Sequence, residues 1–329
     1  MSVEEDGTTT HKDKDTRGCR YLLGNDTSDT LTLPDGRKLG YARYGSPTGH
    51  AIFYHHGLPG SRIEAASYQD IALELGLRII AVDRPGIGLS TPHPQRTLLD
   101  CPRDLQCLVD HLQLKSYSVL GASGGGPYTL ACAAALPASK LKCVSVVCGV
   151  GPMDIGMKGA DFQHQIGFPY AWKYAPVFLL KWFFNRDAFG RMDLSDEQRL
   201  QRVLDPSNLA SIKDLRDREI MADEDFIRLV LRSTREARAQ GFDGIALDGR
   251  TICSDWGFRV EDIRKDLPVQ LWYGKDDCFV PAHHGVQIAA RLGGGIENVV
   301  LRVEDDTHTT ITQRWKRAQL EAIAAVMQG

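Results

Sequence analysis

Residues 116–126 read Ser-Tyr-Ser-Val-Leu-Gly-Ala-Ser-Gly-Gly-Gly, and this stretch decides how the middle of the chain folds. Its apolar first half favours a short strand, and the residues after it, 127–136, favour a helix with proline in the first turn. Between them, residues 121–125 match G-x-S-x-G, which is typical of a sharp turn from strand to helix. We therefore expect Ser123 to be lifted clear of the sheet, at a helix N-terminus that favours negative charge.

A glycine-rich loop before a helix is also typical of phosphate binding. The run fits neither G-x-G-x-x-G nor G-x-x-x-x-G-K-[ST], so the sequence gives little support to a nucleotide site. Because G-x-S-x-G recurs by chance, a chemically active serine also needs a base and an orienting acid elsewhere in the chain.

Candidate partners lie in two loops that each follow a predicted strand. Adjacent aspartates at 276 and 277 follow the apolar run 269–273, and His308 lies shortly after the run 298–303. The carboxyl ends of parallel strands meet along one edge of a sheet. These side chains are therefore expected to converge with Ser123, although they are far from it in sequence.

From about residue 29 to its end, the chain resembles α/β-hydrolase-fold serine hydrolases. The run His-Gly-Leu-Pro-Gly-Ser at 56–61 is similar to the oxyanion loop of that family. The pattern D-x-x-G-x-G-x-S at 83–90 resembles a turn of the family, and Trp-Gly-Phe at 256–258 resembles the segment that rejoins the core after a lid. The order serine, aspartate, histidine is also the order of this family.

This resemblance implies roles for individual residues. Ser123 matches the nucleophile and His308 the general base. Asp277 matches the acid, because the family pattern G-x-x-D-x-x-V-P fits it in register. The backbone N–H groups of Leu58 and Gly124 match the oxyanion donors. The loop lacks the triple glycine of the H-G-G-G lipases and esterases, so the chain is not assigned to that subgroup.

Two other aspartates are alternatives for the acid. Asp276 is out of register with the family pattern and is expected to be a loop carboxylate. Asp154 follows the predicted strand 143–147, where some members of the family place the acid. Its other interpretation is a helix N-cap or a loop residue.

The resemblance implies an α/β fold, with a mostly parallel central sheet flanked by helices and an inserted α-helical cap. Residues 29–152 and 252–329 are expected to form the core, and 153–251 the cap. Alternating strands and helices in the first part of the core independently indicate a parallel sheet. Residues 1–28 are polar and expected to be a flexible tail. One helix, 310–327, is expected to close the chain.

The predicted cap carries six aromatic residues close together in its first part. They have two possible roles, a small helical core of their own or an apolar lid over the serine. We expect packing to be the main role of each single residue, and the cap to select a mainly apolar, rather bulky substrate. The six are Trp172, Tyr174, Phe178, Trp182, Phe183 and Phe184.

Other polar residues near the motifs have structural interpretations. His56 is expected to bond loop backbone through its ring, and Arg62 to form a surface or loop ion pair. Asp83 is expected to hold a turn by a hydrogen bond. The pair His283-His284 is expected at an exposed helix start. Because neither His55-His56 nor His283-His284 has zinc-site spacing such as H-E-x-x-H, no metal is expected. The chemistry that the family resemblance implies needs no cofactor.

Composition limits the remaining function classes. The 329 residues are 43% hydrophobic and 25% charged, which is ordinary for a soluble globular protein. The net charge of -3 gives no basic stripe for nucleic acid, and no apolar run is long enough for a membrane span. The first residues do not resemble a secretory signal, and eight scattered cysteines without C-x-x-C favour a reducing compartment. We expect a cytoplasmic protein.

Together these features predict a serine hydrolase that cleaves an ester, lactone or thioester bond of a mainly apolar small molecule. The alternatives in the same pocket are C–C bond cleavage, acyl transfer and cyclisation, which sequence barely separates from hydrolysis. A ligand receptor on the same fold is a further alternative, which an intact serine, aspartate and histidine set disfavours. Epoxide hydrolases and dehalogenases use a carboxylate where this chain has serine. The sequence predicts no oligomeric state.

Overall fold

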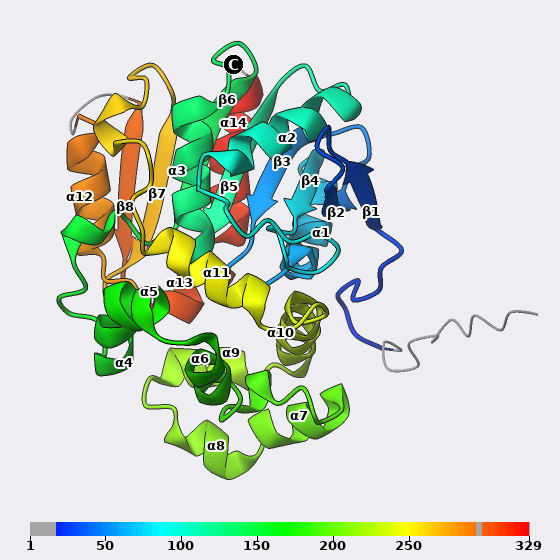
Figure 1. The fold of residues 1–329 in the computed structure, drawn as a ribbon, viewed down its shortest axis with the longest axis vertical. Coiled ribbons are helices and arrows are strands. Elements are labelled where there is room, and N and C mark those ends of the chain that lie inside the picture. The colour runs from blue at the N-terminus through cyan, green and yellow to red at the C-terminus, as the bar shows by residue number, and fades with distance from the viewer. Residues whose placement is uncertain (1–17, 294–297, 329) are drawn as a thin grey trace, which may run out of the picture.

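A computed structural model describes residues 18–293 and 298–328. Its centre is an eight-stranded sheet in the order β1-β2-β4-β3-β5-β6-β7-β8 (Figure 1). The strand β2 is antiparallel to β1 and β4, and all other neighbours are parallel, which confirms the predicted mostly parallel sheet. The strands are β1 Ser28–Thr32, β2 Lys38–Gly45, β3 His50–His55, β4 Leu77–Val82, β5 Tyr117–Ala122, β6 Leu141–Val147, β7 Val269–Gly274 and β8 Val299–Glu304.

Both faces of the sheet are buried, because helices cover each of them. Along β3, Phe53 points into one apolar cluster, while Ile52 and Tyr54 point into the other. This alternation follows from the two-residue period of a strand, and the double burial explains why the inner parallel strands are mainly apolar. One face is covered by α2 (Asp100–His111), α3 (Gly126–Ala135) and α12 (His283–Arg291), and the other by α1 (Gln69–Glu74) and α14 (Lys316–Gln328).

The described end of the N-terminal segment packs onto the rest of the protein. Leu23 is buried in an apolar cluster, and Asn25 accepts a hydrogen bond from Arg62 at 2.6 Å. Arg20 forms an ion pair with Asp223. The predicted flexible tail is therefore wrong for residues 18–28, and its first 17 residues lie outside the described part of the chain.

A helical insertion separates β6 from β7 and lies below the sheet in Figure 1. All of its residues are described, and it contains no strand. Its α10 packs against the short helix η2 (Arg62–Tyr68) of the core. The helices of the insertion are η4 Met153–Ile155, α4 Phe162–Ile166, η5 Gly167–Ala171, α5 Trp172–Tyr174, α6 Val177–Phe184, η6 Ala188–Gly190, α7 Asp196–Val203, α8 Pro206–Ser211, α9 Leu215–Met221, α10 Glu224–Ala237 and α11 Asp243–Ile252.

Buried ion pairs join the insertion to the core. Arg62, which is fully buried, pairs with Asp83 at 2.6 Å and with Glu236 of α10 at 2.8 Å. Asp83 also accepts the N–H of Leu89 at 2.9 Å and so holds the predicted turn. Arg62 forms an ion pair as expected, but the pair is buried and not at the surface, because two carboxylates far apart in sequence surround it. A buried charge persists only when it is paired in this way.

The chain closes with two helices rather than the predicted single helix. After α13 (His308–Arg314) the helix stops at Trp315, and α14 begins at the next residue. The Trp315 indole donates to Asp306 at 2.6 Å and packs near Trp272, with ring centres 6.0 Å apart. These contacts accompany the break, and the helical pattern of the sequence does not reveal them.

Candidate active site

The turn between β5 and α3 holds Ser123 in an uncommon backbone conformation. Its φ of 51° lies in the left-handed region, which non-glycine residues rarely adopt. A side chain at Gly121 has no room, because a Cβ there would lie 2.2 Å from Thr129 Oγ1. The turn therefore depends on glycine before Ser123 and concentrates backbone strain at the serine itself, as functional sites often do.

The side chains of Ser123, His308 and Asp277 form one hydrogen-bonded chain. His308, the first residue of α13, has Nε2 3.0 Å from Ser123 Oγ. Its Nδ1 lies 2.7 Å from Oδ2 of Asp277, which follows β7. The other oxygen of Asp277 accepts the N–H groups of Phe279 and Val280, each at 2.8 Å. The structure thus brings together three residues that the sequence places 31 and 185 positions apart.

The surroundings of His308 favour its charged form. Burial is the largest influence and lowers the pKa of His308, but the charges and hydrogen bonds of Asp277 and Cys148 together outweigh it and raise that pKa well above 6.5. Cys148 contributes in the same direction, with its sulfur 3.8 Å from Nε2. An imidazolium formed at this position is therefore stabilised, and a neutral imidazole needs a pH above that pKa.

The segments that carry the two predicted oxyanion donors are in contact beside Ser123. A Cβ added to Gly124 would lie 2.7 Å from Leu58 Cβ and 3.1 Å from Leu58 N. A Cβ added to Gly57 would lie 3.8 Å from Ser123 Cβ. The backbone of Leu58 therefore lies close to Gly124, on the side of Ser123.

Two residues without an assigned role in the sequence analysis hold this loop. The Glu64 carboxylate accepts the N–H of Gly57 at 3.2 Å and the hydroxyl of Tyr54. Burial raises the pKa of Glu64 from 4.5. The buried guanidinium of Arg84 donates to the carbonyls of His56 at 2.6 Å and Gly57 at 2.8 Å. As expected, the His56 ring also contacts loop backbone, with Nδ1 2.8 Å from the Gly57 carbonyl.

The helical insertion reaches the catalytic residues through aromatic contacts. The ring of Phe279 lies 5.1 Å from that of His308, between centres. The ring of His164, which belongs to α4 of the insertion, stacks on the Phe279 ring with their centres 4.4 Å apart. Asp161 donates its N–H to the carbonyl of Cys278 at 2.7 Å. The insertion therefore forms part of the wall beside the base.

The alternative acids are engaged elsewhere. Asp276 pairs with Arg216 of α9 at 2.8 Å, and Arg216 also donates to the carbonyl of Asp305 at 2.6 Å. Arg216 thereby links the loop that carries the acid to the loop that carries the base. The Asp154 side chain is 66% exposed and pairs with Arg291 at 2.6 Å. Of the three aspartates considered, Asp277 is the one that contacts His308.

The expected packing role of the six aromatic residues is wrong for most of them. Trp172 and Phe184 do pack, with ring centres 5.2 Å apart in the apolar cluster between α5, α6 and α11. The side chains of the other four are exposed. Their exposed fractions are 69% for Tyr174, 68% for Phe178, 62% for Trp182 and 42% for Phe183.

Histidines outside the catalytic chain also differ from expectation. His283 starts α12 as predicted, but His284 is fully buried and accepts the N–H of Gly151 at 3.0 Å. Within the described residues, two groups have atoms placed to hold a metal ion. One consists of Cys148 with the Asp277 and His308 pair, and the other of His55, Cys101 and Cys132.

Comparison with known proteins identifies the fold family. A family model described as alpha/beta hydrolase fold matches residues 50–311. The chain is 32% identical over 108 residues to a proline iminopeptidase of Arabidopsis thaliana, and 32% identical over 119 residues to a non-heme chloroperoxidase of Streptomyces lividans. These matches cover 32% and 36% of this chain, and 28% and 43% of the relatives. The aligned parts are thus less than half of either relative.

Solved structures resemble the chain over nearly its whole length. An esterase from Exiguobacterium antarcticum superposes with a TM-score of 0.61 at 17% identity, covering 91% of this chain and 98% of the other. The enol-lactonase from Burkholderia xenovorans gives 0.58 at 16% identity, covering 92% and 100%. At such identities the likeness concerns the fold. None of the helices in the described parts of the chain combines the length and apolar character needed to cross a membrane.

Proposed function

Because the chain belongs to the alpha/beta hydrolase fold family, we propose that it is a serine hydrolase that cleaves an ester, lactone or thioester bond of a mainly apolar small molecule. The observation that carries this proposal is the hydrogen-bonded chain from Ser123 Oγ through His308 to Asp277, with separations of 3.0 and 2.7 Å. A serine linked in this way to a base and an orienting acid is an activated nucleophile.

In the first half of the proposed reaction, Ser123 Oγ attacks the acyl carbonyl. Its proton passes to Nε2 of His308, and the resulting imidazolium is stabilised by Asp277, which already raises the His308 pKa. The carbonyl oxygen becomes negative and accepts the N–H groups of Leu58 and Gly124. One such donor typically contributes about 10²–10³ in rate.

In the second half, an acyl-enzyme forms on Ser123 and water then hydrolyses it. His308 gives its proton to the departing alcohol or thiol, which leaves an acyl group on Ser123. Water then enters, and His308 removes its proton as the water oxygen attacks the acyl carbon. The serine regains the proton when the acid product departs, so the residues return to their starting state.

The residues beside the catalytic chain favour a substrate whose acyl or alcohol part is apolar. Phe279 lies against His308, and Leu58 lies against Gly124. Leu58 also packs, partly buried, against the apolar cluster of the insertion, together with Met153 and Phe168. Apolar walls with few polar groups are typical of small-molecule pockets.

The proposal is tested with a panel of ester, thioester, lactone and amide substrates. We expect wild-type turnover of at least one ester-type substrate, with larger apolar acyl groups preferred to acetate. Ser123→Ala should lose on the order of 10⁴-fold or more, by the precedent of other triads. Asp277→Asn should be severe and clearly worse than Asp276→Asn, which changes the neighbouring carboxylate. Equal activity in these variants and wild type would contradict the assignment.

A second candidate is an aminopeptidase, which the partial match to a proline iminopeptidase favours. An amide of N-terminal proline belongs in the panel for this reason. Faster turnover of that amide than of every ester would favour the peptidase. Product analysis with an added alcohol or amine distinguishes acyl transfer from hydrolysis.

A further inference from the structure

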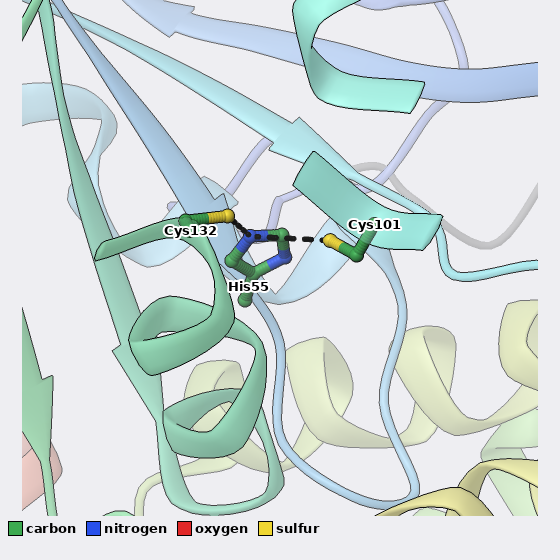
Figure 2. A group of neighbouring side chains, drawn as sticks. All are labelled: His55, Cys101 and Cys132. Carbon is green, nitrogen blue, oxygen red and sulfur yellow. Dashed lines mark hydrogen bonds between the residues drawn. The ribbon is translucent and has the colours of Figure 1, made fainter. Parts of the chain in front are cut away.

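His55, Cys101 and Cys132 form a compact group outside the catalytic chain (Figure 2). They come from the end of β3, the first turn of α2 and the middle of α3. The His55 ring lies between the two sulfurs, with Nε2 3.6 Å from Cys132 Sγ and 3.8 Å from Cys101 Sγ. The three candidate ligand atoms all lie within 4.8 Å of one another.

These separations fit a tetrahedral zinc ion. With Zn–S near 2.3 Å and Zn–N near 2.0–2.1 Å, tetrahedral geometry puts the nitrogen and each sulfur about 3.5–3.6 Å apart. Two thiolates and one neutral imidazole balance the charge of a divalent cation. Charge balance matters here because His55 and Cys132 are fully buried, and an uncompensated charge is costly there. Soft sulfur ligands with imidazole also suit zinc.

The polar contacts of the His55 ring are made by one of its two nitrogens. Its Nδ1 is buried without a hydrogen-bond partner in the part of the chain that is described, so the two sulfurs are the polar contacts of the ring. Of the three residues, Cys101 lines a cavity of about 20 Å³, and His55 and Cys132 do not. This volume is enough for one water molecule beside the Cys101 ligand.

We propose that His55, Cys101 and Cys132 bind one Zn²⁺ ion, with water as the fourth ligand. Binding releases both thiol protons to solvent, so affinity rises with pH. The ion ties β3 to α2 and α3. The strand β3 leads directly into the loop that carries Leu58. The role of the ion is therefore to stabilise that part of the core, and it takes no part in the reaction.

The test uses the full chain, purified under reducing conditions and stripped with a chelator. Titration with Co²⁺ should give thiolate-to-metal charge-transfer absorption that saturates at one equivalent, and Zn²⁺ should abolish it by competition. Zn²⁺ should also raise the thermal midpoint of wild type, because a ligand that binds only the folded state stabilises it. Cys101→Ser and Cys132→Ala should lose both effects.

Matched controls separate this group from other thiols. Cys143→Ser and Cys253→Ser change buried cysteines outside the group and should keep one-equivalent binding. Circular dichroism checks folding, and His55→Gln is a further variant if a cysteine variant does not fold. Absence of the absorption in wild type, its persistence in the Cys101 and Cys132 variants, or its loss in Cys148→Ser would overturn the proposal. The last result would put the metal beside His308.

Discussion

Replacing Asp248 by asparagine should destabilise the protein strongly. Asp248 lies in α11, is fully buried and accepts bonds from Arg84 at 2.8 Å, Arg96 at 3.0 Å and Tyr128 at 2.6 Å. The variant leaves two buried guanidinium groups without their shared charge. Removing one partner of a buried pair costs about 3–5 kcal/mol, so we expect the free energy of unfolding to fall by about that amount.

Asp154→Asn is the matched control, because it removes the same charge from an exposed pair. The Asp154 side chain is 66% exposed, and its pair with Arg291 should contribute at most about 1 kcal/mol. Urea denaturation followed by tryptophan fluorescence and circular dichroism gives both free energies. If the two variants were equally stable, the reasoning about buried pairs would be refuted.

The same experiment has a catalytic readout. Arg84 also donates to the carbonyls of His56 and Gly57, so loss of its counter-ion should loosen the loop that carries Leu58. We expect Asp248→Asn to lower kcat, and Asp154→Asn to leave it unchanged. A fall in kcat for Asp154→Asn would instead favour Asp154 as the acid that orients the base.

Three further outcomes are expected. Because the His308 pKa lies well above 6.5 and catalysis needs neutral imidazole, kcat/KM should fall as pH drops through that pKa, and Asp277→Asn should move the fall to lower pH. Gly121→Ala should destabilise by about 1–3 kcal/mol, measured by urea denaturation, since its Cβ would lie 2.2 Å from Thr129 Oγ1. Burial lowers the pKa of Lys316 from 10.5 to about 7, so the unfolded chain binds one more proton between these values. The free energy of unfolding of wild type should therefore rise relative to that of Lys316→Met as pH rises from 7. Any advantage of wild type over the variant should shrink or reverse at lower pH.

Sequence pattern was sufficient for the positions of the strands and for the loops that bring Ser123, Asp277 and His308 together. The reason is that strand period, turn glycines and strand-end loops are local features with strong sequence signals. The hydrogen bond from the Gly57 N–H to Glu64 has no such sequence signal. Every residue other than proline has a backbone N–H, so the donor requires no particular side chain at its position. Only the fold shows that Glu64 faces the loop.

Predictions failed where tertiary contacts decide the outcome. The sequence predicts a surface or loop ion pair for Arg62, and charged side chains are usually exposed. It is buried because Asp83 and Glu236, 21 and 174 positions away, both reach it. The predicted packing of the six aromatic residues was wrong for a related reason. Which side of a helix faces outward depends on its neighbours, and α6 is apolar around most of its circumference, VFLLKWFF.

The most direct measurement of the central claim is labelling by a fluorophosphonate, followed by intact mass and peptide mapping. Wild type should gain one adduct, located on Ser123, and lose hydrolytic activity in proportion to labelling. Ser123→Ala should remain unlabelled, and His308→Ala should label far more slowly. Equal labelling of wild type and Ser123→Ala, or hydrolysis that continues undiminished after complete labelling of Ser123, would contradict the account.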